Sequence, residues 1–143
     1  NKVGHLRASE YVKLFDDANT AFYVHTGLAD ENLVHDGTTS FLMDLHTCYL
    51  AELRAGETVH IGAQVLEVDA RRVHLIYQMT TAADGRLAAT CELAIINMNM
   101  ATRRPAPWSA VQQEIWKALT AAHGDMPKPP QSGRSIGNLA AKT

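Results

Sequence analysis

The sequence predicts an α+β fold in which a long central helix is wrapped by a curved antiparallel β-sheet, with a C-terminal helix and an extended tail. Three observations support this prediction: one strongly apolar helical segment, a series of segments that alternate between apolar and polar residues, and short turn-like separators between them. A helix and a sheet each bury an apolar face, so this order favours two packed layers. At 143 residues, of which 46% are hydrophobic, the chain suits one domain over residues 1–143.

The first predicted element is a helix over residues 9–25. Its apolar residues recur three and four positions apart, and Gly27 is placed to end the last turn. Additional apolar residues widen this face beyond one stripe; they are Val12, Ala21, Tyr23 and Val24. A helix with so wide an apolar surface is expected to be enclosed by other elements.

Four extended segments follow, over residues 39–53, 57–69, 71–82 and 86–100. The last three have the period-two alternation of a half-buried strand. The separators are short and contain Ala-Gly, Asp-Ala and Asp-Gly pairs, which predicts an antiparallel meander. Such a sheet leaves an edge strand exposed, and pairing between copies would cover it, so we expect a homodimer or homotetramer.

The C-terminal part begins where Pro105 and Pro107 break the strand pattern. Ser109 is a good cap for a second helix over residues 109–123. The tail from Gly124 is rich in Pro, Gly and Ser and is expected to be an extended arm.

Composition narrows the possible functions. A net charge of −2 gives no basic excess for nucleic acid or an anionic membrane, and no apolar run is long enough to span a bilayer. Cys48 and Cys91 lie in predicted strands without a disulfide pattern, which favours the cytoplasm and packed thiols. No histidine has the spacing of a closed zinc site, and neither a nucleophile elbow nor a dinucleotide-binding glycine motif is present.

The loop before the first helix has the properties of an oxyanion site. Gly4 lets backbone approach a ligand closely, and the amides that open the helix near Ala8 and Ser9 favour negative charge in front of them. The alternative is an ordinary turn that leaves His5 in solvent.

Several segments, in their order along the chain, resemble one family. They are Gly-His-Leu-Arg at 4–7, Tyr-Leu-Ala-Glu-Leu at 49–53, Asp-Ala-Arg-Arg-Val-His-Leu at 69–75, Met-Ala-Thr-Arg at 100–103 and Gly-Arg-Ser-Ile-Gly at 133–137. The chain resembles the hotdog-fold acyl-CoA thioesterases of the 4-hydroxybenzoyl-CoA thioesterase-like superfamily. Within them it is most similar to the betainyl-CoA thioesterases of L-carnitine breakdown, which also occur fused to carnitine dehydrogenase.

The resemblance implies a thioester hydrolase that acts on a short acyl-CoA, such as betainyl-CoA, with coenzyme A as part of the substrate and no other cofactor. It places Asn1 at the family's catalytic Asp, Gly4 at the close-approach glycine and the Ala8 amide at the oxyanion donor. It also implies a strand before residue 1. Asparagine can orient a water but cannot act as a carboxylate base. The alternative is therefore a hotdog protein that binds acyl-CoA but is catalytically weak or silent. A hotdog dehydratase or hydratase is a minor alternative.

Other residues are candidates beside this loop. His5 is a candidate pocket residue, and His46 is a candidate for substrate binding on a strand whose alternation also places Glu52 on the same face. For His5 the alternative is a solvated histidine, and for His46 a structural one. Asp16 and Asp17 are possible substitute bases, or simply the solvated side of the helix.

The substrate suggests two more candidates. A trimethylammonium group is attracted by aromatic faces, which makes Tyr11 a candidate substrate-binding residue. The phosphates of coenzyme A call for arginine near the mouth of the pocket, and Arg72 is the candidate, with a solvated turn residue as the alternative.

Overall fold

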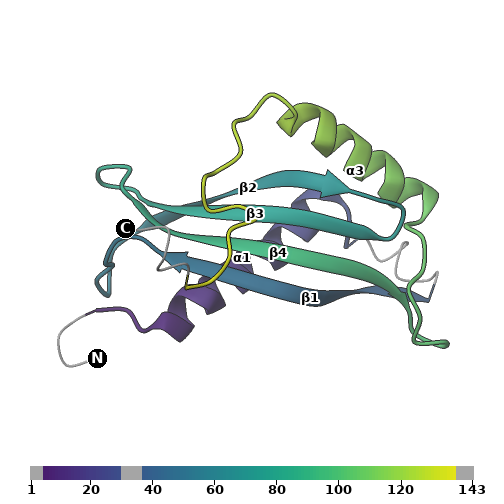
Figure 1. The fold of residues 1–143 in the computed structure, drawn as a ribbon, viewed down its shortest axis with the longest axis horizontal. Helices are drawn as coiled ribbons and strands as arrows, with labels where there is room; N and C mark the ends of the chain where they lie inside the picture. Colours follow the sequence, from purple (N-terminus) through teal and green to yellow (C-terminus); the bar gives the residue numbers. More distant parts are fainter. Residues whose placement is uncertain (1–4, 30–36, 138–143) are drawn as a thin grey trace.

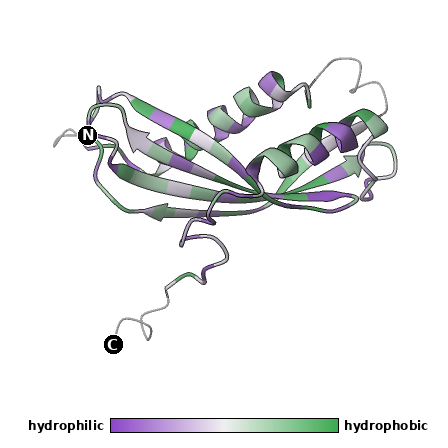
Figure 2. Cartoon of the chain, turned by 90° about the horizontal axis from the view of Figure 1, so that it is seen from above, coloured by the Kyte–Doolittle hydropathy of each residue, from purple (hydrophilic) through white to green (hydrophobic). Residues whose placement is uncertain are grey.

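A computed structural model describes residues 5–29 and 37–137 and shows a four-stranded antiparallel sheet with both helices on one of its faces (Figures 1 and 2). The predicted α+β plan, both helices and all four strands are confirmed. The elements are α1 (Ala8–Thr26), β1 (Thr38–Tyr49), β2 (Val59–Val68), β3 (Arg72–Thr81), β4 (Leu87–Asn99) and α3 (Ala110–His123).

The order of strands in the sheet is β1-β4-β3-β2. The predicted meander is correct for β2, β3 and β4, which turns join, but wrong for β1, which pairs with β4. The reason is the segment after β1. Leu53 is fully buried, and its backbone bonds to Leu6 and to the Tyr11 hydroxyl beneath the start of α1. The chain therefore leaves β1 and reaches β2 at the opposite edge of the sheet.

Helix α1 has well-defined ends. Arg7 is extended, and its amide donates to the Glu10 carboxylate at 2.8 Å, so an acidic side chain sits in the first turn. Gly27 ends the helix with φ of 85°, and its amide donates to the Val24 carbonyl at 3.2 Å. The glycine stop predicted from the sequence is confirmed.

The expected enclosure of α1 is wrong for the single chain. Tyr11 and Phe15 are buried against the sheet, but Val24 is 65% exposed. The four strands cover only one side of the helix. On the flank towards β1, the α1 residues Asp16, Asn19, Thr20 and Tyr23 line an open cavity.

Helix α3 is held to the same face by indole rings. Trp116 packs on Trp108, with ring centroids 5.4 Å apart, and on Phe22 of α1 at 6.3 Å. Buried Asn97 donates to the carbonyls of Ala106 and Pro107, at 3.2 and 3.0 Å, which fixes the proline-rich connection before the helix.

The tail crosses the opposite face of the sheet (Figure 1). Gln64 donates to the carbonyls of Met126 and Pro127, and the Gly133 amide donates to the Glu92 carboxylate at 2.8 Å. Both cysteines are free and buried, as predicted. Within the described ranges, no helix combines the length and apolar character needed to cross a membrane.

Burial of Tyr23 predicts a loss of stability at alkaline pH. Its hydroxyl bonds to Ser40 at 3.1 Å, but desolvation dominates and raises the pKa of Tyr23 to about 12. The neutral phenol is therefore fully stabilising below pH 10, where the unfolded chain is also neutral, and this contribution is lost as the pH rises towards 12.

We expect the free energy of unfolding to fall more steeply between pH 9.5 and 11.5 in the wild type than in Tyr23→Phe, by roughly 2 kcal/mol. Urea unfolding at both pH values measures the difference. Equal losses in the two proteins would show that the Tyr23 phenol does not ionise preferentially in the unfolded chain.

Candidate active site

The loop before α1 is bound to the chain just after β1. His5 forms an antiparallel bridge with Arg54, and the Leu6 amide donates to the Leu53 carbonyl at 3.0 Å. The Tyr49 hydroxyl donates to the Ala8 carbonyl, also at 3.0 Å. The first turn of α1 is therefore held in place by contacts outside the helix.

The amides of Ala8 and Ser9 open this turn. The first amide with a backbone acceptor is that of Glu10, which donates to the Arg7 carbonyl at 3.0 Å. No group in the described part of the chain accepts the Ala8 or Ser9 amide, and both residues are exposed. Two free donors at the positive end of a helix dipole can stabilise an oxyanion.

A histidine and a carboxylate meet beside these amides. His5 Nδ1 contacts Glu52 Oε1, and the two side chains are 30% and 58% exposed. With Nδ1 donating to the carboxylate, Nε2 of a neutral His5 is the nitrogen that can accept a proton. The predicted common face of His46 and Glu52 is wrong, because β1 ends at Tyr49 and Glu52 turns towards His5.

The other predicted residues of this loop divide into two groups. Asn1 and Gly4 lie outside the described residues. Tyr11 lies directly beneath the loop, but it is 5% exposed, and its hydroxyl accepts from the Leu53 amide at 3.0 Å. Its ring meets that of Tyr49 edge-on, with centroids 5.1 Å apart. Tyr11 thus supports the loop from within the core.

His46 is not close to this loop. In β1 it is paired with Glu92, on the face of the sheet away from α1. Glu92 accepts from the Gly133 amide and lies 2.5 Å from Nε2 of His74. This polar cluster therefore belongs to the face that the tail crosses.

Arg72 lies at the end of the sheet far from the start of α1, since it is paired with Ile96 of β4, whereas Tyr49 is paired with Ala89. Its guanidinium is 2.7 Å from the Asp69 carboxylate. The Arg71 amide and the Arg72 side chain lower the pKa of Asp69. Within one chain, the structure does not bring Arg72 to the helix start.

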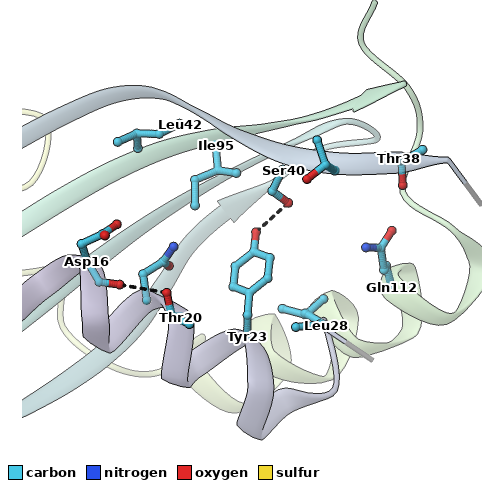
Figure 3. Close-up of a pocket in the computed structure, with 12 residues that line it drawn as sticks. Asp16, Thr20, Tyr23, Leu28, Thr38, Ser40, Leu42, Ile95 and Gln112 are labelled. Carbon is cyan, nitrogen blue, oxygen red and sulfur yellow. Dashed lines mark hydrogen bonds between the residues drawn. The ribbon is translucent and has the colours of Figure 1, made fainter. Parts of the chain in front are cut away.

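A cavity of about 400 Å³ opens between α1 and β1 (Figure 3). Asp16 is the only charged residue among the described residues that line it; Asp17 does not line it, and both side chains are exposed. The sequence left both residues open as candidates, and the structure distinguishes them. The lining residues are Asp16, Asn19, Thr20, Tyr23, Leu28, Ala29, Thr38, Thr39, Ser40, Leu42, Ile95 and Gln112.

Hydrogen bonds and burial define the interior of this region. The Tyr77 hydroxyl donates to Asn19 Oδ1 at 2.6 Å, which fixes a polar side chain of the cavity wall. Burial raises the pKa of Cys91 to about 11, and the negative charge of Asp16 adds to the shift. Cys91 is thus a neutral thiol at pH 7.

Within residues 5–29 and 37–137, no group of three or more His, Cys, Asp or Glu side chains could hold a metal ion.

No local pattern in the sequence indicated the pairing of His5 with Glu52. It depends on the bridge between His5 and Arg54, which joins distant parts of the chain. For Asp16, helical spacing could have separated it from Asp17, since Asn19 and Tyr23 follow it on the same side of α1.

Known proteins are similar to this chain in sequence and in fold. A family model described as thioesterase-like superfamily matches residues 1–116. A betainyl-CoA thioesterase of Pseudomonas aeruginosa is 30% identical over 94% of this chain and 84% of its own length. An L-carnitine dehydrogenase/betainyl-CoA thioesterase of Rhizobium meliloti is 25% identical, and this chain spans 27% of its length.

Among solved structures, a Staphylococcus aureus protein in complex with CoA superposes with a TM-score of 0.79 and 28% identity, covering 93% of this chain and 84% of the other. A 1,4-dihydroxy-2-naphthoyl-CoA thioesterase from Synechocystis shares the fold, with a TM-score of 0.70 at 16% identity over 90% of each chain. The hotdog fold predicted from the sequence is thereby confirmed. The chain belongs to the thioesterase-like superfamily, and the thioester-hydrolase class predicted from its sequence is confirmed with it.

Proposed function

We propose that this protein hydrolyses a short acyl-CoA thioester, with betainyl-CoA as the substrate and glycine betaine and CoA as the products. The observation that carries the proposal is the pair of free amides at the start of α1 beside the His5–Glu52 pair. The name of the Pseudomonas aeruginosa relative supports the choice of acyl group.

In this proposal the amides of Ala8 and Ser9 bind the thioester carbonyl oxygen. As water adds to the carbonyl carbon, negative charge develops on that oxygen, and the donors and the helix dipole stabilise it more strongly than the neutral ground state. Their rigid attachment through Tyr49 and Leu53 means that they need no reorganisation during the reaction.

His5 acts as the general base. Nε2 takes a proton from the attacking water, while Glu52 holds Nδ1 and stabilises the imidazolium that forms. Collapse of the tetrahedral intermediate breaks the carbon–sulfur bond and releases CoA as a thiolate, which receives the proton from His5. This assigns to His5 the proton transfer that Asn1 cannot perform.

The Asn1 position also motivates a second candidate function, an acyl-CoA-binding protein with little turnover. Release of CoA from a panel of acyl-CoAs, followed with a thiol reagent, separates the two functions. We expect turnover of the short esters by the wild type. Tight binding without CoA release, together with activity gained in Asn1→Asp, would instead support the binding protein.

We also propose a homodimer formed by antiparallel pairing of the β1 edges. Three consecutive apolar residues of this edge strand are exposed to solvent: Phe41 is 39% exposed, Leu42 53% and Met43 48%. An exposed apolar edge strand favours pairing with another copy. Two such dimers could also associate as a tetramer.

Replacing Ala8 by proline tests the oxyanion donor. Proline is accepted at the first position of a helix, and the extended Arg7 before it, with φ of −75° and ψ of 153°, has the backbone conformation that proline requires of its neighbour. The substitution removes the amide hydrogen and keeps the carbonyl that binds Tyr49. We expect kcat to fall about 100-fold or more, with little change in Tm.

Ala8→Ser is the matched control, because it keeps the amide. A proline variant that retains wild-type kcat would remove the Ala8 amide from the mechanism.

His5→Ala tests the base. Loss of a general base is expected to lower kcat by about 10²- to 10⁴-fold with little effect on KM, since the imidazole acts mainly in the transition state. Glu52→Gln keeps the size of the side chain but removes its charge. It should lower kcat without loss of the fold. Steady-state kinetics at several pH values measures both.

His25→Ala is the control, because His25 is an exposed histidine in the last turn of the same helix. Wild-type kcat in both His5→Ala and Glu52→Gln would assign the proton transfer elsewhere.

A further inference from the structure

The cavity between α1 and β1 has the chemistry of a cation site. The Asp16 carboxylate points from the helix towards the strands (Figure 3). In the described ranges no side chain forms an ion pair or hydrogen bond with this carboxylate, and the Thr20 hydroxyl donates to the backbone carbonyl of Asp16 instead. Asp16 is exposed in the single chain. A carboxylate without a counter-ion attracts positive charge and disfavours anions.

The rest of the lining suits a quaternary ammonium group. The Tyr23 ring stands in the cavity, and aromatic rings attract such cations without hydrogen bonds. Leu28, Leu42 and Ile95 add apolar surface for methyl groups. At about 400 Å³ the cavity suits a small group, since it lies towards the low end of the usual range for ligand pockets, roughly 300–1,000 Å³.

The length of α1 places this cavity too far from its own oxyanion donors. At 1.5 Å per residue, Asp16 lies about 12 Å along the helix from Ala8. In a betainyl group, the carbonyl carbon and the quaternary nitrogen are separated by two bonds, about 2.5 Å. One chain cannot hold both ends of this acyl group with Ala8 and Asp16.

A second copy solves this geometric problem. The start of α1 is bound to the end of β1 through Tyr49, whereas the cavity is flanked by Thr38 and Ser40 at the beginning of β1. Antiparallel pairing of two β1 strands places the end of one strand beside the beginning of the other. The apolar β1 edge is the surface available for this pairing.

We infer that Asp16 selects a cationic acyl group in the cavity between α1 and β1, and that the thioester of this acyl group is held by the α1 start of a second copy. The inference rests on the proposed function and extends it to the residue that sets the choice of acyl group. Asp16 binds the ammonium group, and Ala8 and Ser9 of the other copy bind the carbonyl oxygen.

The first test compares betainyl-CoA with 3,3-dimethylbutyryl-CoA, in which carbon replaces the nitrogen and the shape is unchanged. The wild type should prefer the cation in kcat/KM, and Asp16→Asn should reduce this preference at least tenfold. Asp17→Asn, a neighbour outside the cavity, should keep the wild-type ratio. An unchanged ratio in Asp16→Asn overturns the assignment of Asp16.

The two proposals can fail separately. Hydrolysis of both esters without preference for the cation leaves the thioesterase intact and overturns the inference. If neither ester is hydrolysed, the proposed function fails, and calorimetric binding of the two esters decides the inference. Cation preference in binding that is lost in Asp16→Asn supports it, and equal binding of the two esters overturns it.

The second test asks whether the site is shared between copies. Ala8→Pro and Asp16→Asn chains are co-expressed with different tags, and the mixed dimers are purified. If the site is shared, each mixed dimer contains one intact site, and activity towards betainyl-CoA should recover to about half of the wild-type value per dimer. If both groups act within one chain, mixing restores nothing, which overturns the second-copy assignment.

Discussion

The attachment of the first turn of α1 to the chain that follows β1 is the constraint on which the site depends. Leu53 provides it from within the core, since its carbonyl accepts from Leu6 and its amide donates to Tyr11. Tyr49 completes it by donating to the Ala8 carbonyl. Buried polar groups are costly when unpaired, so these bonds fix one arrangement of the loop. Among the residues that the structure describes, no group accepts the Ala8 or Ser9 amide.

This attachment also explains the topology of the sheet. Because Leu53 is held beneath α1, the chain cannot turn back directly from β1 into a neighbouring strand. It crosses to the far edge instead, and the last strand, β4, then fills the place beside β1. The resulting β1 edge lies along the open flank of α1. The incomplete cover of the helix and the cavity beside it therefore have one origin.

Local patterns in the sequence were sufficient for the elements themselves. The three- and four-residue spacing and Gly27 predicted α1 to within a residue or two, and the period-two alternation predicted β2, β3 and β4. Contacts between distant segments were not predictable in this way. The pairing of β1 with β4 and the contact of His5 with Glu52 both depend on where Leu53 is buried.

The candidate site, like the fold, was predictable from the sequence only in part. The helix-start amides and His5 follow from the loop and its position before a helix, and the structure places them together. Tyr11 was a candidate for its aromatic ring, but its position on the buried stripe makes it a support for Leu53. Asp16 was recognised only as one of two equivalent carboxylates, because the open flank of α1 is a property of the folded chain.

The proposed substrate and the residue at position 1 are chemically consistent with each other. A quaternary nitrogen two bonds from the carbonyl carbon withdraws electron density and makes that carbon more electrophilic, so water adds to it more readily. The neutral imidazole of His5 can accept the proton of the attacking water where a carboxylate acts in the resembled family. The same positive charge lies close to the developing oxyanion and stabilises it. Asp16 compensates that charge on binding, from the side away from the carbonyl.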